Sequence, residues 1–244
     1  MGDPAVVVDE VPALRQIFAV EFTSAAAAAV EARGRFVVAV PGGSVATTFF
    51  PVLAELPVDW LRVDIFWIDE RAVPPEHPDS NYGLASRLWL QPAGVPASRV
   101  HRMRGELADL GEAARLAADE LKTVAGDPPH LDLAIAGVGE DGHVASLFTS
   151  GAGLTGSAGQ TGSAGLQPCP VIAIYDAPKP PPRRLTMTLP VLARARRVIV
   201  AGFGVSKAKV MHDVLHGGAD PTPVGELVRQ ARSPLVLLDR PYSH

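Results

Sequence analysis

The sequence predicts an α/β fold in which a mostly parallel β-sheet is flanked by helices. Short apolar runs, each long enough for one buried strand, alternate with segments whose apolar residues recur at helical spacing. That alternation is typical of parallel strands connected by helices. Several of the apolar runs also end in glycine-rich turns, which place backbone amides at the carboxyl edge of such a sheet. No break in the pattern requires a boundary, so we expect a single domain over residues 1–244.

The first elements follow from composition and spacing. Residues 11–32 are rich in alanine and carry apolar residues at helical spacing, which predicts a long helix. The run 36–40 is continuously apolar and β-branched, as expected of a strand buried on both faces. Helical spacing returns over 44–56, where Ser44 is placed to cap the helix. The run 63–68 predicts the next strand.

The remaining elements continue the alternation. Helical patterns over 80–90 and 110–124 precede the apolar run 133–136, which predicts a buried strand. The last predicted strands are 171–174, 198–201 and 235–238, and the last predicted helices are 207–215 and 224–232.

Composition excludes several functional classes. The 244 residues are 47% hydrophobic and 20% charged with a formal net charge of −4, which is ordinary for a globular protein and gives no electrostatic reason to bind nucleic acid or an anionic membrane. The lone Cys169 excludes an internal disulfide, and no residues have zinc-site spacing. We see no secretory signal and no apolar run long enough to span a bilayer. We therefore expect a cytoplasmic protein.

Two segments have unusual composition. Residues 151–165 repeat Thr-Gly-Ser-Ala-Gly at 155–159 and 161–165, and such a sequence predicts a flexible loop that buries no core. The loop is either a lid over a nearby site or a neutral expansion. Residues 178–182, Pro-Lys-Pro-Pro-Pro, predict an extended polyproline segment. We interpret it as a stiff connector, in preference to a ligand of SH3-type domains, because it lies within the α/β alternation.

The turn Gly137-Val138-Gly139-Glu140-Asp141-Gly142-His143 is the strongest functional signal. It follows a predicted strand, and His143 supplies a group that exchanges protons near neutral pH. The turn also matches the dinucleotide-binding pattern G-x-G-x-x-G. We reject that interpretation because Glu140 and Asp141 would face the pyrophosphate, and because no strand ending in an acidic residue follows at the required distance.

Other strand ends carry groups that suit a phosphate. Gly42, Gly43 and Ser44 form a turn into a predicted helix, whose N-terminal amides favour an anion. Lys207 lies in the first turn of another predicted helix, where it opposes the helix dipole unless an anion is near. Arg71 follows Asp69 at a third strand end and has the geometry to grip a phosphate. Together these signals favour a phosphorylated sugar or a similar substrate, although the reaction itself is not specified by them.

At these motifs the chain resembles the 6-phosphogluconolactonase family, within the wider group that includes glucosamine-6-phosphate deaminase. The matching segments span nearly the whole chain in the family's order: Pro41-Gly42-Gly43-Ser44, Trp67 to Arg71, Ser80 to Gly83, Gly137 to Phe148, Asp176 to Thr186 and Lys207-Ala208. The resemblance implies a three-layer fold with a modified doubly wound sheet, no metal and no organic cofactor. It implies an enzyme that hydrolyses 6-phospho-D-glucono-1,5-lactone to 6-phospho-D-gluconate in carbohydrate metabolism, as the second step of the oxidative pentose phosphate pathway.

The resemblance also implies roles for individual residues. His143 corresponds to the histidine that activates water, and Asp69 and Asp141 are site carboxylates, either of which could orient it. The phosphate and substrate contacts correspond to Gly42, Gly43, Ser44, Arg71 and Lys207, with Arg184 as a further candidate. The implied partner is a small sugar-phosphate lactone, and we expect a monomer.

One departure and two alternatives accompany this hypothesis. After Phe148 the family usually has Pro-Gly-His, whereas this chain has Thr149-Ser150 and the repeat. The first alternative is a deaminase-like isomerase, which carries a glutamate five residues after the histidine, where this chain has Phe148. The second is a non-catalytic sugar-phosphate sensor, which would not need His143.

Overall fold

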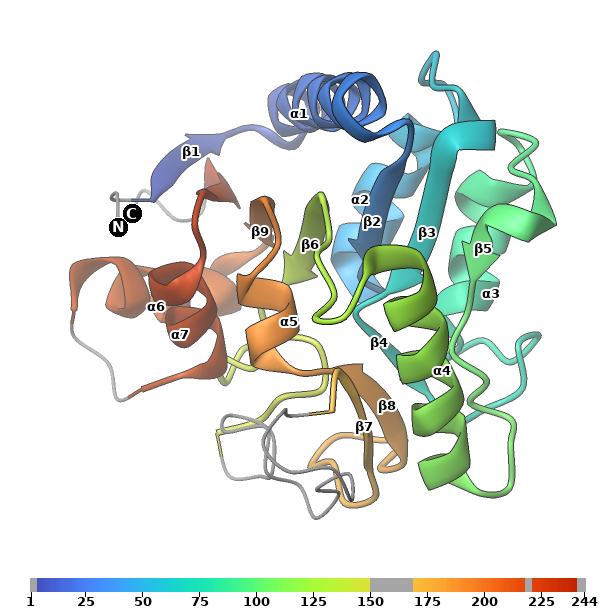
Figure 1. Ribbon diagram of the computed structural model, residues 1–244. Coiled ribbons are helices and arrows are strands. Elements are labelled where there is room, and N and C mark those ends of the chain that lie inside the picture. The colour runs from blue at the N-terminus through green and yellow to red at the C-terminus, as the bar shows by residue number, and fades with distance from the viewer. Residues whose placement is uncertain (1–3, 150–168, 218–220, 241–244) are drawn as a thin grey trace.

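The computed structural model describes residues 4–149, 169–217 and 221–240, and a seven-stranded sheet runs through its centre (Figure 1). Every pair of neighbouring strands in this sheet is parallel. In spatial order the strands are β1 (Ala5–Asp9), β10 (Pro234–Asp239), β9 (Arg197–Gly202), β6 (Leu133–Gly137), β2 (Phe36–Val40), β3 (Val63–Trp67) and β5 (Val100–His101).

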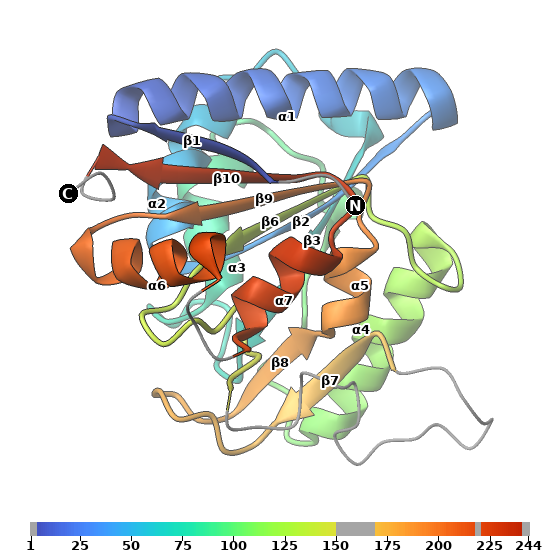
Figure 2. The ribbon, with the colours of Figure 1, turned by 90° about the vertical axis from the view of Figure 1, so that its left-hand side faces the viewer.

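Helices cover both faces of this sheet, which confirms the predicted three-layer α/β class. Alternate residues of β2 divide the core: Phe36 and Val38 pack with one set of helices, and Val37 and Ala39 pack with the other. On the first face lie α1 (Val11–Arg33), α2 (Gly43–Leu53) and α3 (Asn81–Ala85). On the second lie α4 (Leu110–Ala125), α5 (Leu189–Ala193), α6 (Val205–His216) and α7 (Pro223–Gln230). Figure 2 shows α1 on one side of the sheet and α5, α6 and α7 on the other.

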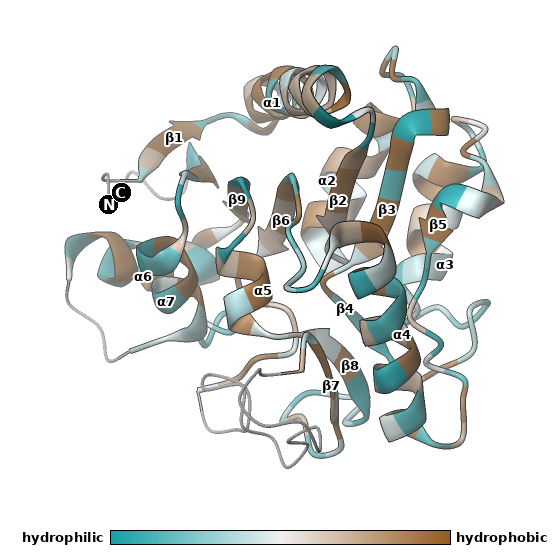
Figure 3. Cartoon of the chain, in the orientation of Figure 1, coloured by the Kyte–Doolittle hydropathy of each residue, from teal (hydrophilic) through white to brown (hydrophobic). Residues whose placement is uncertain are grey.

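Hydropathy follows this layering. In Figure 3 strand β2 is mostly hydrophobic, whereas α4 alternates hydrophobic and hydrophilic residues, as an amphipathic surface helix does. Helix α1 is long and apolar enough to cross a membrane by length and composition. Its Leu14, Phe18 and Phe22 side chains are fully buried in the core, so one face of the helix packs against the sheet.

A second, three-stranded antiparallel sheet lies beside α4. Its order is β4 (Asp69–Arg71), β8 (Arg184–Met187) and β7 (Val171–Ile174). Strand 171–174 therefore forms as predicted, but our placement of it in the parallel alternation was wrong. The reason is that β7 pairs with β8, which also pairs with β4. The sequence of β8, Arg-Leu-Thr-Met, contains no apolar run from which a strand could be predicted.

Several other elements differ from the prediction. Strands β1, β4, β5 and β8 and helix α5 were not predicted, because they are short, polar or at a sheet edge. The helix predicted over 80–90 forms as α3 and then widens into a π-type turn over Ser86–Leu90. The loop predicted over 151–165 lies outside the described residues.

The order of the strands creates a switch point between β2 and β6. From β2 the chain continues to β3 and β5 on one side, whereas β6, β9 and β10 build the other side. The loops that leave the carboxyl ends of β2 and β6 therefore diverge, and α/β sheets bind ligands in the crevice that such a divergence opens.

Candidate active site

A pocket of about 480 Å³ opens at this switch point. Its walls come from the segments that follow β2, β3, β6 and β9 and from the segment that precedes β8. Most of the predicted site residues line it, namely Gly42, Gly43, Ser44, Asp69, Arg71, His143, Arg184 and Lys207. Asp141 contacts the His143 ring. The fold thus brings together residues from five separate parts of the chain.

The turn after β2 presents the N-terminus of α2 to the pocket. Helix α2 begins at Gly43, which has a φ of 63°, and Gly42 is its N-cap. The prediction that Ser44 caps this helix was therefore wrong, since Ser44 lies inside the first turn. A Cβ atom on Gly42 would lie 1.7 Å from Oδ1 of Asn81. Glycine is therefore needed at position 42 to let the turn approach Asn81, and the first residues of the helix line the pocket, where a helix N-terminus favours an anion.

Lys207 meets this turn from the other side of the pocket. Its Nζ donates a hydrogen bond to Ser44 Oγ at 2.9 Å. Lys207 lies in the first turn of α6, whose N-cap Gly204 donates its N–H to both carboxylate oxygens of Asp239 at 3.0 and 2.9 Å. Burial lowers the pKa of the Lys207 ammonium, while Glu140 acts in the opposite direction. A partly desolvated cation beside a helix N-terminus is an arrangement that favours a bound anion.

Backbone hydrogen bonds close the glycine turn after β6. Gly139 donates its N–H to the carbonyl of His143 at 2.9 Å, and Gly142 donates to the carbonyl of Gly139 at 3.0 Å. Gly142 has a φ of 78°, in the region that favours glycine. A Cβ atom on Gly139 would lie 2.0 Å from Nδ1 of His143. The glycines therefore let the chain double back and hold the imidazole directly over the turn.

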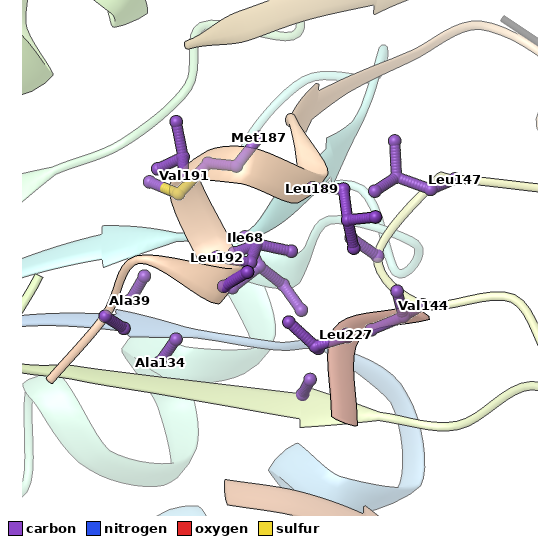
Figure 4. Close-up of a cluster of buried hydrophobic side chains, with 14 of the residues drawn as sticks. Ala39, Ile68, Ala134, Val144, Leu147, Met187, Leu189, Val191, Leu192 and Leu227 are labelled. Carbon is purple, nitrogen blue, oxygen red and sulfur yellow. The ribbon is translucent and has the colours of Figure 1, made fainter. Parts of the chain in front are cut away.

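Buried side chains anchor this turn in the core. Val144 and Leu147 follow His143 and are fully buried, and Figure 4 shows them in a cluster with Leu189 and Leu227. Val144 and Leu147 also exchange backbone hydrogen bonds at 3.4 and 2.9 Å. His143 is thus displayed by a turn that is fixed at both ends.

Asp141 is the carboxylate that orients His143. Its Oδ1 pairs with Nδ1 of the ring, so Nε2 remains available to a ligand. Lys179 Nζ donates to the same Oδ1 at 3.3 Å. Burial alone would raise the pKa of the Asp141 carboxyl, but the hydrogen bond to His143, aided by the charge of Lys179, lowers it below its usual value. The ring of Phe148 packs against the imidazole with a centroid separation of 4.8 Å.

Asp69 lies on another wall of the pocket, and the described structure shows no hydrogen bond between it and His143. Its Oδ2 accepts a hydrogen bond from Ser146 Oγ at 2.7 Å, and its Oδ1 accepts one from Asn81 Nδ2 at 3.3 Å. The same Asn81 amide donates to the Asp69 carbonyl at 2.9 Å. Asp69 is nearly buried and fixed on both sides, as expected of a group that orients a polyhydroxylated ligand.

Glu70 and Arg71 connect this wall to helix α3. The buried Glu70 carboxylate accepts four hydrogen bonds: from the backbone N–H groups of Arg71, Asn81 and Tyr82 at 2.7, 2.8 and 2.8 Å, and from Ser80 Oγ at 3.0 Å. Burial nonetheless raises the pKa of Glu70. Arg71 Nη1 donates to the Asp79 carbonyl at 2.7 Å, while its buried Nε has no hydrogen-bond partner among the described residues.

Arg184 is held mainly by the protein itself. Its Nε donates to the Pro181 carbonyl at 2.9 Å, and its Nη2 donates to the carbonyls of Lys179 and Pro180 at 3.0 and 3.1 Å. Its Nη1 lies 3.4 Å from Ser146 Oγ. Most of the guanidinium is therefore occupied by backbone carbonyls, although the side chain still lines the pocket.

Three residues of this network were not singled out by sequence reasoning: Asn81, Ser146 and Lys179. Ser80 caps helix α3, because its Oγ accepts the Gly83 N–H at 3.0 Å. The role of Asn81 in binding Asp69 has no local signal.

The other ionisable clusters among the described residues lie elsewhere. No group of three or more histidine, cysteine or acidic side chains within residues 4–149, 169–217 and 221–240 is placed to hold a metal ion. His101 stacks on Phe66 and bridges Asp64 and Glu120 at 3.0 and 2.8 Å. Burial would lower the pKa of His101, but the two carboxylates raise it to about 9. This histidine is structural.

Comparison with known proteins gives consistent results. The sequence pattern of the family described as "Glucosamine-6-phosphate isomerases/6-phosphogluconolactonase" matches residues 9–236. The 6-phosphogluconolactonase of Mycobacterium tuberculosis is 35% identical over 225 residues, covering 87% of this chain and 86% of that protein. The corresponding Synechocystis protein is 33% identical over 212 residues, covering 82% and 83%. The crystal structure of 6-phosphogluconolactonase from Thermotoga maritima has the same fold, with a TM-score of 0.82 at 23% identity over 97% of this chain and 99% of that chain.

Proposed function

The chain belongs to the glucosamine-6-phosphate isomerase/6-phosphogluconolactonase family, and we infer that it hydrolyses 6-phospho-D-glucono-1,5-lactone to 6-phospho-D-gluconate. That reaction is the second step of the oxidative pentose phosphate pathway. The observation that carries the proposal is that one pocket contains both an oriented histidine and a site suited to an anion. His143 is paired with Asp141, and Lys207 donates to Ser44 at the start of α2.

We assign the phosphate to the anion site. The N-terminal amides of α2, the Ser44 hydroxyl and the Lys207 ammonium converge there, and each interacts favourably with a dianion. Charge-assisted hydrogen bonds of this kind are about twice as strong as neutral ones. Binding the phosphate at this end of the pocket leaves the lactone ring to extend toward Asp69, Arg71 and His143.

His143 is then the general base. Its Nε2 takes a proton from water as the water oxygen adds to the lactone carbonyl carbon. The bond between that carbon and the ring oxygen then breaks, and the ring oxygen receives the proton from the imidazolium. The new carboxylic acid ionises to water. Asp141 holds the ring in the required tautomer and stabilises the imidazolium that forms.

Asp69, Arg71 and Arg184 position the substrate in this proposal. The Asp69 carboxylate is fixed by Ser146 and Asn81 and is placed to accept hydrogen bonds from sugar hydroxyls. Arg71 lines the pocket, and its guanidinium is held there by the Asp79 carbonyl. Arg184 contributes less directly, because it holds the segment that carries Lys179.

Phe148 argues against the deaminase-like alternative. The deaminase-like alternative requires a glutamate five residues after the histidine. In this chain that position is Phe148, whose ring packs on His143 with a centroid separation of 4.8 Å. A non-catalytic sensor would have no need for the Asp141–His143 pair. We further propose that the enzyme is a cytoplasmic monomer that needs neither metal nor organic cofactor.

A substrate panel tests the function. Purified protein in chelator is given 6-phosphogluconolactone or glucosamine 6-phosphate, and 6-phosphogluconate binding is measured by calorimetry. The lactonase predicts lactone hydrolysis well above the spontaneous rate and no ammonia from the aminosugar. Release of ammonia would establish the deaminase, and binding without any turnover would establish the sensor.

A further inference from the structure

The proline-rich segment 178–182 carries one charged side chain into the pocket. Lys179 lines the pocket, and its Nζ lies 3.3 Å from Oδ1 of Asp141, the oxygen that also pairs with His143. The two residues are 38 positions apart in the sequence. The contact therefore results from the fold and is not a local turn.

The backbone of this segment is fixed from behind. The buried Arg184 guanidinium donates to the carbonyls of Lys179, Pro180 and Pro181 at 3.0, 3.1 and 2.9 Å. The Ala177 N–H also donates to the Pro182 carbonyl at 2.9 Å, which closes the loop. Prolines restrict the backbone further. The backbone that carries Lys179 is thus held, and its 42% exposed side chain extends from this fixed point to Asp141.

A continuous set of contacts now joins the two site carboxylates. Asp69 contacts Ser146, Ser146 contacts Arg184, and Arg184 binds the Lys179 carbonyl. Lys179 in turn contacts Asp141, which pairs with His143. Arg184 therefore couples the wall that holds the sugar to the pair that activates water.

We propose that Lys179 is a positioning residue of the active site, which holds the Asp141 carboxylate in the orientation that supports His143. The proposal rests on the proposed function, because positioning matters only if His143 acts as a base. The side chain of Asp141 is 43% exposed, so without a second contact its carboxylate is free to rotate away from the ring. Lys179 supplies that second contact at the same oxygen.

The competing explanation is an ordinary exposed ion pair. Such pairs contribute about 0–1 kcal/mol and influence no chemistry. A second competing explanation is direct binding of the substrate phosphate by Lys179, next to Lys207. The three explanations differ in which kinetic constant responds and in whether the effect depends on Asp141.

The experiment compares Lys179→Met and Lys179→Arg with Arg183→Met as a matched control. Arg183 directly follows the segment and is exposed, and its side chain contacts the Tyr175 ring and the Ala108 carbonyl, outside the pocket. We expect Lys179→Met to lower kcat about fivefold, or about 1 kcal/mol in activation free energy, with KM changed less than twofold. Lys179→Arg should recover most of kcat, and Arg183→Met should match the wild type.

The pH profile gives a readout that a merely structural role would not move. If the Asp141 carboxylate turns away from the ring without Lys179, it stabilises the protonated imidazole less, whereas loss of the Lys179 charge alone would favour that form. The positioning role therefore predicts that the acid limb of kcat/KM moves to lower pH in Lys179→Met. The other charged groups that line the pocket are unchanged in this variant: Asp69, Arg71, Glu140, Arg184 and Lys207.

A double-mutant cycle with Asp141→Asn decides the mechanism. If Lys179 acts through Asp141, Lys179→Met should cause no further loss of kcat in the Asp141→Asn background. An equal loss in both backgrounds would overturn the proposal, as would wild-type kcat in Lys179→Met. An increase confined to KM would assign Lys179 to the phosphate instead.

Failure of the proposed function would be seen separately, as a wild-type protein without lactonase activity. The contact can then still be tested by NMR, from the titration of the His143 ring protons in the free protein. A midpoint that moves downward in Lys179→Met, and not in Arg183→Met, would support the positioning role. An upward shift, which loss of the Lys179 charge alone would cause, or identical titration in all variants would contradict it.

Discussion

Substitution of Gly42 by alanine is a sharp test of how the pocket is built. The backbone of Gly42 has φ −105° and ψ −158°, an extended conformation that alanine also adopts, so any effect must come from the added methyl group. That Cβ atom would lie 1.7, 2.3 and 2.8 Å from Oδ1, Cγ and Nδ2 of Asn81. The Asn81 side chain must therefore leave its position.

The cost follows from what Asn81 gives up. Its Nδ2 donates to the Asp69 carbonyl at 2.9 Å and to the Asp69 carboxylate at 3.3 Å, and Asn81 is almost completely buried. Each lost hydrogen bond costs about 1 kcal/mol, and overpacking adds about 1–3 kcal/mol. We expect Gly42→Ala to lower the free energy of unfolding by about 3–5 kcal/mol.

Urea unfolding of a double-mutant cycle with Asn81→Ala provides the assay. All three clashing atoms lie beyond the Asn81 Cβ, so the double variant should be about as stable as Asn81→Ala alone. The matched control is Gly43→Ala, whose Cβ would meet no atom within 4 Å but whose φ is 63°. It should cost about 1–2 kcal/mol in either background. Additivity of Gly42→Ala with Asn81→Ala would refute the steric explanation.

Two further predictions concern charge. Lys207→Ala should weaken 6-phosphogluconate binding by about 1.5–3 kcal/mol, the scale of a hydrogen bond to a charged group. It should also raise KM for the phosphorylated lactone far more than KM for gluconolactone. Equal losses for both lactones would show that Lys207 does not bind the phosphate. The pKa of His101 is raised to about 9 by Asp64 and Glu120, so its contribution to stability is complete below about pH 6.5 and is lost as the pH rises through 9. Unfolding of His101→Gln across this range should be less pH-dependent than that of the wild type, and parallel curves would contradict this assignment.

The sequence predicted the parts of the fold that have local signals. Strands β2 and β6 are continuous apolar runs, and the turns that follow them are rich in glycine, which makes them recognisable in the sequence. Strands β4 and β8 could not be predicted in the same way. They are short and polar, and they pair Asp69 with Thr186 across more than a hundred residues. The second sheet was missed for that reason.

The site was predictable to a similar degree. His143, Lys207 and the Gly42–Gly43 turn lie at strand ends, and that placement alone brought them together. The N-cap of α2 is Gly42 and not the predicted Ser44. The conformation of this turn depends on the close approach of Asn81 to Gly42, a tertiary contact that has no local signal in the sequence. The contact of Lys179 with Asp141 is likewise invisible in the sequence, where the proline-rich segment reads only as a stiff connector.

The measurement that tests the central claim most directly is hydrolysis of 6-phosphogluconolactone by the wild type and His143→Asn, side by side in chelator. Asparagine retains hydrogen-bonding capacity but cannot act as a base near neutral pH. We predict wild-type hydrolysis well above the spontaneous rate and a kcat for His143→Asn about 10²-fold lower or more, with 6-phosphogluconate binding nearly unchanged. A folded His143→Asn protein with near wild-type kcat would contradict the account.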